Sequence, residues 1–286
     1  MDDLIRIAAI HDLSGVGKCS LTVALPVISA SGVECACLPT ALLSTHTGGF
    51  QNFTFKDLSD ELLPIAQHWI AEGLSFDGIY SGYLASAKQA QLLEAVISLL
   101  ASEKTKIIID PVMADNGEYY SNLGPDMCAA FRRLCGSAHI ITPNITEAAL
   151  LTGLEYREGP HEKAYIQSLT DALSKLCSGI VVVTGVRPDS SSIGVYAINT
   201  ATGEDCFSCA PASEGVFCGT GDIFASAFAA LTLRGASLKE AVETATALVS
   251  ESIGRTVVRA TPRRNGVDFE NALPNYIKRV SALFEQ

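Results

Sequence analysis

A glycine-rich tetrad, Gly219-Thr220-Gly221-Asp222, stands directly before a stretch of small and apolar residues (223–233) that is typical of a helix. Glycines at a helix start leave backbone amides pointing outward, and these amides and the helix dipole can stabilise a transferring phosphoryl group. The carboxylate of Asp222 can accept the proton of an attacking hydroxyl. A plain capped helix start would have the same sequence, so the tetrad indicates phosphoryl transfer without requiring it.

Oxygen-bearing side chains stand at the ends of two apolar runs. Asp110 ends the run TKIIID, and Asn144 and Glu147 follow the run HIITP. Carboxylate and amide oxygens suit Mg²⁺, often through water, and the ion would bridge nucleotide phosphates that face the tetrad. Taken singly, each residue is more often a helix cap or a solvated turn. Together with the tetrad they favour a kinase site, with Asp110 and Glu147 as metal ligands.

The segment His11-Asp12-Leu13-Ser14-Gly15-Val16-Gly17-Lys18 follows the first apolar run and invites comparison with a phosphate-binding loop. A Walker A loop requires glycine five positions before Gly17 and serine or threonine after Lys18. This chain has Asp12 and Cys19 at those positions. We therefore reject the Walker interpretation. The glycines either let the backbone approach a ligand or close an ordinary strand-to-helix turn.

Short apolar runs alternate with helical patterns along the first two thirds of the chain. The runs that read as buried parallel strands span residues 4–10, 32–38, 77–84, 105–110, 139–143 and 179–186. Between them, 89–100 and 162–176 carry apolar residues at helical spacing. We predict an α/β fold with a doubly wound, mostly parallel central sheet flanked by helices. In such sheets ligands bind beyond the carboxyl ends of the strands, where the polar residues above stand.

The last third changes in pattern. Residues 191–199 and 204–211 predict a hairpin-like pair of strands, and mostly helical sequence follows from Gly219. No repeat or long Pro/Gly/Ser linker divides the chain, so we expect a single domain over residues 1–286.

Composition narrows the function classes. The chain has 286 residues, 48% of them hydrophobic, and a formal net charge of −11. That charge argues against nucleic acid as a partner, whereas a single nucleotide can still bind if amides and a divalent cation neutralise its phosphates. No apolar run approaches the roughly 18 residues of a membrane helix. We expect a soluble cytoplasmic protein without a membrane partner, whose nine cysteines are reduced.

The motifs resemble those of the ribokinase-like superfamily, and within it the pyridoxal and pyridoxamine kinases together with the hydroxymethylpyrimidine kinases. The resemblance runs over almost the whole chain. It rests on residues 12–17, 45–48, 81–84, 110–115, 142–147 and 219–222.

This resemblance implies an ATP-dependent kinase. It makes Asp222 the catalytic base and the amides of Gly219, Thr220 and Gly221 the anion hole. It places four residues near the phosphates and Mg²⁺, and a fifth near the nucleotide: Asp110, Asp115, Asn144 and Glu147, then Thr184. A monovalent cation such as K⁺ and a homodimer are further expectations from the family.

The resemblance also implies where the substrate binds. Thr47 and Tyr83 would line a vitamin pocket, with Tyr83 packed on a pyridine ring. Pyridoxal kinases have Gln-Ser-His at the first strand, where this chain has Ile10-His11-Asp12 followed by a Ser-Gly-x-Gly stretch typical of pyrimidine kinases. The missing serine would be replaced by His11, Asp12 or Ser14.

Three readings of the function follow from these motifs. We expect phosphorylation of the 5'-hydroxymethyl group of a B6 vitamer (pyridoxal, pyridoxamine or pyridoxine) in pyridoxal phosphate salvage. A hydroxymethylpyrimidine (phosphate) kinase of thiamine synthesis is the alternative enzyme. A non-catalytic nucleotide- or vitamin-binding protein is the third reading, against which the intact Asp222 argues. Residues 115–120 could form a flap that excludes water from the site, or a plain surface loop.

Overall fold

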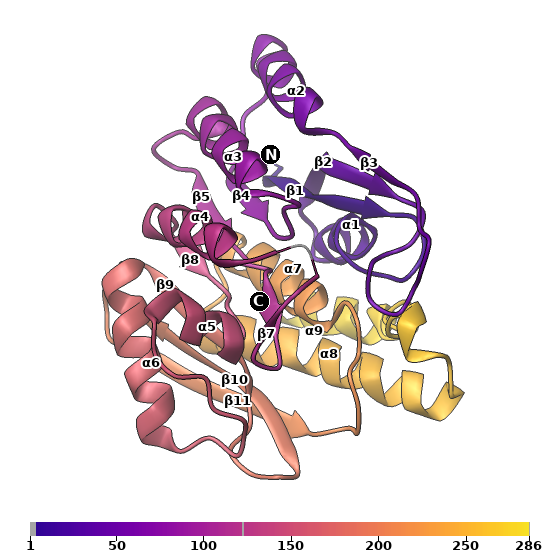
Figure 1. The fold of residues 1–286 in the computed structure, drawn as a ribbon, viewed down its shortest axis with the longest axis vertical. Coiled ribbons are helices and arrows are strands. Elements are labelled where there is room, and N and C mark those ends of the chain that lie inside the picture. The colour runs from indigo at the N-terminus through magenta and orange to yellow at the C-terminus, as the bar shows by residue number, and fades with distance from the viewer. Residues whose placement is uncertain (1–3, 122, 286) are drawn as a thin grey trace.

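The computed structural model describes residues 4–121 and 123–285 as a nine-stranded sheet with helices on both faces (Figure 1). The strand order is β11-β10-β9-β8-β5-β4-β1-β2-β3. These strands are β1 (Arg6–Ser14), β2 (Glu34–Leu43), β3 (Phe55–Asp57), β4 (Gly78–Ser81), β5 (Lys106–Ile109), β8 (Ile140–Ile141), β9 (Ile180–Val186), β10 (Ser192–Asn199) and β11 (Asp205–Pro211). A separate small hairpin pairs β6 (Ala114–Asp115) with β7 (Glu118–Tyr119).

Nine α-helices and one short 3₁₀ helix are found in the described part of the chain. They are α1 (Leu21–Ala30), α2 (Ser59–Ala71), α3 (Ala87–Leu100), α4 (Pro125–Gly136), α5 (Ile145–Thr152), α6 (Lys163–Leu176), α7 (Thr220–Leu233), α8 (Leu238–Arg259), η1 (Arg263–Asn265) and α9 (Leu273–Phe284). Among them, none is both long and apolar enough to cross a membrane.

The centre of the sheet is parallel, and its edges are antiparallel. Strands β2, β1, β4, β5, β8 and β9 run parallel, whereas β10 and β11 close one edge and β3 the other in antiparallel pairing. The central strands are buried on both faces, which explains their continuous apolar sequences. The predicted doubly wound, mostly parallel sheet is confirmed, and so is the hairpin of β10 and β11.

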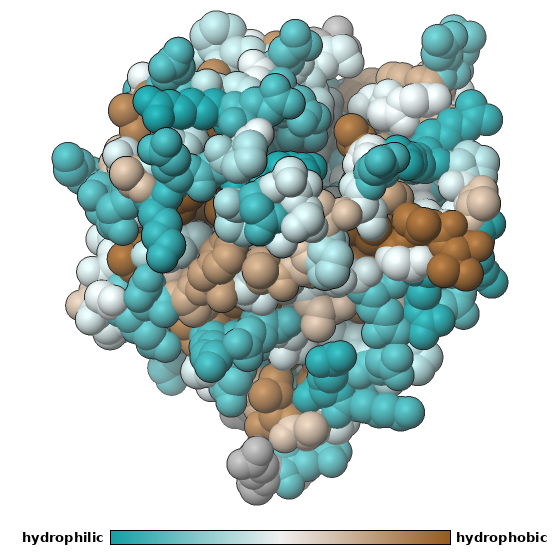
Figure 2. All heavy atoms as spheres, turned by 90° about the horizontal axis from the view of Figure 1, so that it is seen from below, coloured by the Kyte–Doolittle hydropathy of each residue, from teal (hydrophilic) through white to brown (hydrophobic). Residues whose placement is uncertain are grey.

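Two apolar clusters fill the space between the sheet and the helices. Helices α2 to α6 cover one face of the sheet, and α1, α7, α8 and α9 cover the other (Figure 1). Their apolar side chains contribute to the two clusters. Helix α7 is buried continuously from Ile223 to Leu231, as expected for a helix that is apolar on all sides. On the surface shown in Figure 2, hydrophilic side chains predominate and hydrophobic ones gather in separate patches.

Two predicted strands are shorter than expected. The run 77–84 ends as a strand at Ser81, and the backbone of Gly82, the next residue, passes closely over the ring of His11. The run 139–143 keeps two strand residues, Ile140 and Ile141. Pro143 has no amide hydrogen, although its carbonyl still accepts a hydrogen bond from the Thr184 amide at 3.0 Å.

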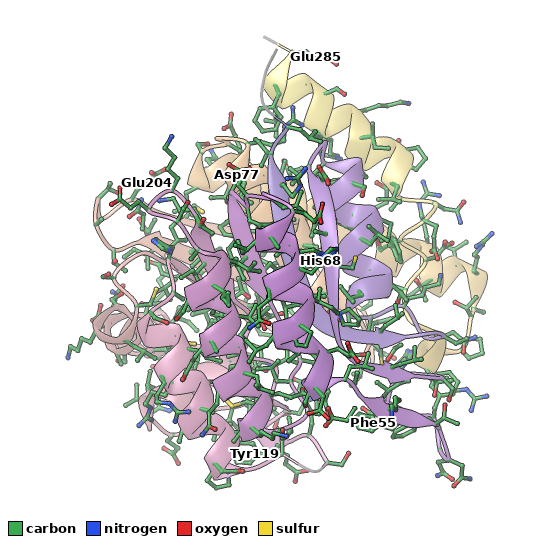
Figure 3. All side chains as sticks on the ribbon, turned by 90° about the horizontal axis from the view of Figure 1, so that it is seen from above. Phe55, His68, Asp77, Tyr119, Glu204 and Glu285 are labelled. Carbon is green, nitrogen blue, oxygen red and sulfur yellow. The ribbon has the colours of Figure 1, made fainter. Side chains whose placement is uncertain are left out.

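The two ends of the sheet separate clearly when the molecule is seen from above (Figure 3). Asp77 and Glu204 lie near the end at which the parallel strands begin, and Phe55 and Tyr119 near the end at which they finish. Of the predicted site residues, Tyr83, Asp110 and Asn144 follow β4, β5 and β8 at this second end.

Candidate active site

The glycine-rich tetrad forms the start of α7. Gly219 is the N-cap and has a φ of +80°, a conformation that L side chains rarely adopt. A Cβ at this position would overlap the carbonyl oxygen of Lys18, so the loop after β1 packs directly on Gly219. Within the described residues no side chain caps α7. Its first amides are therefore available to an anion, as the sequence predicts.

Asp222, in the first turn of α7, has an acid–base character suited to proton transfer. Burial, assisted by the charge of Asp12 and opposed by a hydrogen bond from the backbone of Ser20, raises the pKa of its carboxyl to about 7. A general base is most effective when its pKa lies near the working pH. Asp222 thus combines the predicted position with a suitable pKa.

Asp12 and Ser14 form a buried polar pair at the end of β1. The hydroxyl of Ser14 donates to one Asp12 carboxylate oxygen at 2.7 Å, and the hydroxyl of Ser20 donates to the other. Burial raises the pKa of Asp12, and the two hydroxyls oppose this effect. Part of the hydrogen-bonding capacity of Asp12 and Ser14 is therefore used within the protein, and their contact with substrate stays a prediction.

His11 lies inside the molecule. Its side chain is buried, its ring meets Tyr80 edge-on at a centroid distance of 4.3 Å, and the backbone of Gly82 packs against it. Burial lowers the pKa of His11 to about 3, so the ring is neutral. Neither ring nitrogen has a hydrogen-bond partner among the described residues. The structure thus gives His11 a buried, neutral ring with unpartnered nitrogens, and its contact with substrate stays a prediction.

The loop that carries Thr47 is held by its neighbour His46. His46 Nδ1 accepts from the Gly48 amide at 2.9 Å, and Nε2 donates to the carbonyl of Arg264 at 2.6 Å. Thr47 itself is exposed.

Tyr83 is half-buried, and the Asp12 charge is among the causes that raise its pKa, after burial. Tyr83 is therefore close to the end of β1, where a ring substrate is predicted.

Residues 23–264 match the phosphomethylpyrimidine kinase family. The chain belongs to this family. Solved structures extend the similarity. A protein named as a phosphomethylpyrimidine kinase from Bacteroides thetaiotaomicron, solved with pyridoxal, is 34% identical, with a TM-score of 0.91 and 96% of each chain covered. Pyridoxal kinase from Lactobacillus plantarum is 31% identical, with a TM-score of 0.88, covering 98% of this chain and 99% of that one.

A curated relative has a different name. The thiamine biosynthetic bifunctional enzyme of Arabidopsis thaliana is 29% identical over 84% of this chain. The chain spans 44% of that enzyme's length. Kinases named for a pyridine and proteins named for pyrimidine or thiamine chemistry are therefore both similar to this phosphomethylpyrimidine kinase family member.

In this family member the Asn-x-x-Glu motif is a capping box at the start of α5. Asn144 Oδ1 accepts from the Glu147 amide at 2.9 Å, and Glu147 Oε2 accepts from the Asn144 amide at 2.9 Å. Glu147 Oε1 also accepts from the amides of Met113 and Ala114, at 3.0 and 3.4 Å. The motif thereby fastens the segment after β5 to α5.

Three carboxyl groups influence one another in this part of the site: Asp110 and Glu147, which are buried, and Asp222, which is half-buried. Burial and the charge of Asp222 raise the pKa of Asp110 to about 8. Burial and the charge of Asp110 raise the pKa of Glu147, while its three amide donors lower it. Asp110 is therefore linked electrostatically both to Asp222 at the start of α7 and to the capping box.

The buried acids suit a cation that completes its coordination with other ligands. No group of three or more His, Cys, Asp or Glu side chains in the described part of the chain could hold a metal ion alone. Mg²⁺ usually keeps several waters and binds through one or two carboxylates plus substrate phosphates. The raised pKa values of Asp110 and Glu147 show that the protein itself disfavours the charged form of these carboxyls, which a bound cation would stabilise. These residues therefore fit a magnesium–nucleotide complex.

Asp115, Thr184 and the predicted flap lie near the capping box that contains Glu147. Asn144 forms an isolated bridge with Thr184 on β9, which brings the two predicted nucleotide residues together. Residues 115–120 include most of the β6–β7 hairpin, and the amide of Gly117 donates to Thr146 Oγ1 at 3.0 Å. Burial raises the pKa of Asp115. The hairpin is therefore docked on α5 beside the site.

Two site residues were missed from the sequence. Tyr120 is partly exposed as a residue, and desolvation of its phenol together with the charges of four carboxylates, including Glu147 and Asp222, raises its pKa. Burial and the charge of Asp222 also raise the pKa of Cys19. A tyrosine within a predicted flap offered a weak signal for Tyr120, whereas nothing local marked Cys19.

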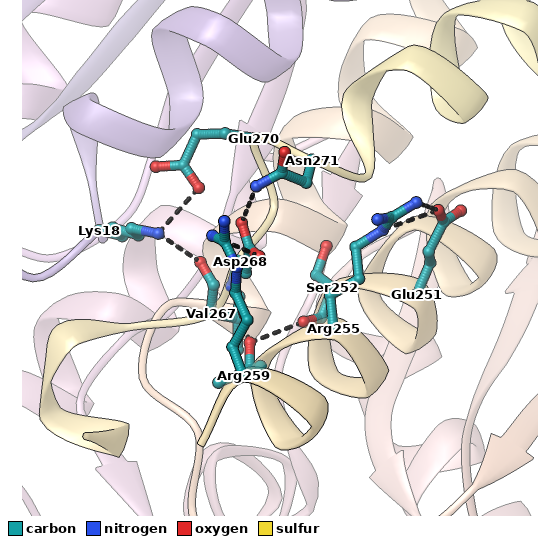
Figure 4. Close-up of polar contacts among 10 residues, drawn as sticks. Lys18, Glu251, Ser252, Arg255, Arg259, Val267, Asp268, Glu270 and Asn271 are labelled. Atoms are coloured by element: carbon teal, nitrogen blue, oxygen red, sulfur yellow. Dashed lines mark hydrogen bonds and ion pairs between the residues drawn. The ribbon is translucent and has the colours of Figure 1, made fainter. Parts of the chain in front are cut away.

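Lys18 is directed to the C-terminal segment. Its Nζ donates to the carbonyl of Val267 at 3.2 Å and to Glu270 Oε2 at 2.8 Å (Figure 4). This contact agrees with the rejection of a Walker loop, in which the lysine reaches the phosphates.

Proposed function

We propose that this protein transfers a phosphoryl group from ATP to the 5'-hydroxymethyl group of a B6 vitamer, in pyridoxal phosphate salvage. One observation carries the proposal: Asp222, with a pKa of about 7, stands in the first turn of a glycine-capped helix without a side-chain cap among the described residues. This is the pairing of base and anion hole that in-line phosphoryl transfer requires. The 34% identical Bacteroides protein, solved with pyridoxal, supports the choice of acceptor.

In this mechanism the chain performs two tasks around the reacting hydroxyl. Asp222 accepts the hydroxyl proton as the oxygen attacks the terminal phosphoryl group of ATP, and the phosphorus–oxygen bond to ADP breaks. The amides of Gly219, Thr220 and Gly221 hold the developing negative charge. The β6–β7 hairpin limits the entry of water, which would otherwise compete with the substrate.

The buried acids would hold the nucleotide through Mg²⁺. Asp110 and Glu147 are the proposed metal ligands, with Asp115, Asn144 and Thr184 on the nucleotide side. When bound, Mg²⁺ neutralises phosphate charge and orients the transferred group. K⁺ is a further candidate cation. It rests on the family resemblance.

The vitamer would lie at the end of β1. Thr47 and Tyr83 are proposed to line the ring, and Asp12 and Ser14 to supply its polar contacts. His11, whose ring nitrogens have no partner among the described residues, would supply a further polar contact. We propose that residues 1–286 act as one kinase domain, because a single nine-stranded sheet joins its two halves. A cytoplasmic location and a homodimer complete the proposal and rest on the sequence and the family.

A hydroxymethylpyrimidine (phosphate) kinase of thiamine synthesis is the second candidate. The family to which the chain belongs and the Ser14-Gly15-Val16-Gly17 stretch favour it. Both substrates are flat nitrogen heterocycles with a hydroxymethyl group, so a few polar contacts must decide between them. A non-catalytic vitamin- or nucleotide-binding protein is the third candidate.

Steady-state phosphorylation with ATP and Mg²⁺ tests these candidates. Pyridoxal, pyridoxamine, pyridoxine and hydroxymethylpyrimidine are compared at equal concentrations, with Asp222→Asn as the control. Higher kcat/KM for the pyridines supports the proposal. Higher kcat/KM for the pyrimidine replaces it with the second candidate, and tight binding without turnover replaces it with the third.

A further inference from the structure

The segment Arg264–Glu270, here called the C-terminal strap, crosses the back of the loop Gly15–Ser20, here called the first loop. A Cβ on Gly266 would overlap the carbonyl oxygen of Gly17, so the two backbones are in close contact. Lys18 adds the hydrogen bonds to Val267 and Glu270 (Figure 4). The strap and the first loop are therefore joined by backbone packing and by one cationic side chain.

The strap is itself firmly anchored. The carboxylate of Asp268 pairs with Arg259 at 2.9 Å and accepts from Asn271 Nδ2 at 2.7 Å. The Asp268 amide donates to Thr256 Oγ1 at 2.7 Å. Val267 is buried completely. Because these contacts tie the strap to α8, the strap can serve as a fixed support for a neighbouring loop.

The first loop has a backbone that needs such support. Gly17, Lys18 and Ser20 have φ values of +120°, +57° and +53°. Two of the three are not glycine, and left-handed conformations of other residues persist only when their surroundings hold them. The ring of His46 also packs on Gly17. Contacts with the rest of the molecule therefore maintain the shape of the first loop.

The first loop also reaches the reaction centre. The carbonyl of Lys18 contacts Gly219 so closely that a Cβ on Gly219 would overlap it. Two residues on, the Ser20 hydroxyl donates to Asp12 and the Ser20 backbone lowers the pKa of Asp222. A displacement of Lys18 would thus move neighbours of both the anion hole and the base.

We propose that Lys18 is a positioning residue for phosphoryl transfer. Its ammonium is held by Glu270 and Val267 of the strap, and its backbone holds Gly219 in place for the reaction. Lys18 does not touch the reacting atoms in this assignment. The inference rests on the proposed function for its kinetic readout.

The expected kinetic result is a loss of kcat with little change in binding or stability. In Lys18→Met, kcat should fall about 10-fold, since small misplacements of catalytic groups reduce rates strongly. The KM values for vitamer and ATP should stay within about twofold. The ion pair is partly exposed, with 33% and 51% of the two side chains accessible, so Tm should fall by less than about 3 °C. Lys18→Arg should restore most of kcat.

A matched control and a double variant isolate the contact. Lys239→Met removes a different exposed ion pair, Lys239–Glu243 on α8, and should leave kcat unchanged. Glu270→Gln should lower kcat, and the double variant of Lys18→Met with Glu270→Gln should be no slower than Lys18→Met alone, because both remove one interaction.

Hydrogen exchange provides a readout that does not depend on turnover. In Lys18→Met, the amides of residues 15–20 and 219–222 should exchange faster than in the wild type, while those of α3 stay unchanged. If the wild type phosphorylates none of the compounds, the proposed function fails, and faster exchange at 219–222 still supports the positioning role. Unchanged kcat together with unchanged exchange at 219–222 would overturn it, as would an equal loss of kcat in Lys239→Met.

Discussion

Asp110, at the end of β5, and Asp222, in the first turn of α7, are electrostatically linked: the charge of Asp222 is the second cause, after burial, of the raised pKa of Asp110. The two residues are 112 positions apart in a chain whose fold brings the ends of its parallel strands to one edge. Asp110 is buried and Asp222 half-buried. Two such carboxyl groups in mutual reach favour protonation of one of them unless a cation is present. This relationship makes the stability and the activity depend on pH in predictable directions.

Asp222→Asn should lower activity and raise stability at alkaline pH. General-base catalysis contributes about 10²- to 10⁴-fold, so kcat should fall by that range. The folded-state pKa of about 7 lies above the unfolded value, so the folded form prefers the protonated acid. Ionising Asp222 therefore lowers the free energy of unfolding of the wild type. This loss is absent below about pH 4 and grows until the pH passes 7, with an upper limit of about 4 kcal/mol. Asparagine removes this loss.

Thermal unfolding of Asp222→Asn and wild type at pH 4.5 and pH 8 measures that effect. The variant should gain more stability at pH 8 than at pH 4.5. A variant that is equally destabilised at both pH values would show that Asp222 is a structural residue, and one that keeps wild-type kcat would show that it is not the base.

Asp12→Asn should shift the pH profile of kcat/KM toward lower pH. The charge of Asp12 raises the pKa of Asp222, so removing it lowers that pKa. In the wild type, activity should rise with pH through about 7 as Asp222 loses its proton. In the variant this rise of kcat/KM with pH, the acidic limb of the profile, should begin at lower pH. Asp171→Asn, an exposed position on α6, is the charge-matched control and should leave the limb in place. An unmoved or raised limb in Asp12→Asn would contradict the assignment.

Much of this arrangement could be predicted from local sequence. Continuous apolar runs such as 179–186 indicated buried parallel strands, and the rule that ligands bind at the carboxyl ends of strands located Asp110 and Asn144. The capping role of the Asn-x-x-Glu motif also has a local signature, since an N-cap residue is followed three positions later by glutamate. The sequence predicted where the motif lies. The hydrogen bonds show that the side chains of Asn144 and Glu147 also accept from backbone amides at the start of α5.

Other features depend on contacts that no local pattern records. Lys18 and Glu270 are 252 positions apart, and their contact exists only because the strap returns to the first loop. His11 illustrates a different limit. The sequence placed it at the end of a strand, but whether its ring faces a pocket or the interior depends on Gly82 and Tyr80 from the neighbouring β4 segment.

Glu147→Gln should separate a metal-binding role from a capping role. Glutamine keeps a carbonyl oxygen for the amides on one side but turns its NH2 toward the amide donor on the other, so the loss of stability should be about 1 kcal/mol. Glu147→Ala leaves all of these amides without their acceptor and should lose about 2 kcal/mol. If Glu147 also helps to hold Mg²⁺, Glu147→Gln should need several-fold more Mg²⁺ for half-maximal activity. Urea unfolding and Mg²⁺ titration of the rate measure the two effects. An unchanged Mg²⁺ requirement would restrict Glu147 to the cap.

Gly219→Ala and Gly221→Ala should differ sharply although both change the tetrad by one methyl group. At Gly219 the φ of +80° and the overlap with the Lys18 carbonyl should cost about 2 kcal/mol or more and displace the first loop. Because an anion-hole donor moves, kcat should fall by about 10²-fold or more. At Gly221 a Cβ meets no atom within 4 Å, so stability should be unchanged or higher by up to about 1 kcal/mol. Urea unfolding and kcat of both variants give the comparison. A Gly219→Ala enzyme with wild-type kcat would show that the start of α7 does not form the anion hole.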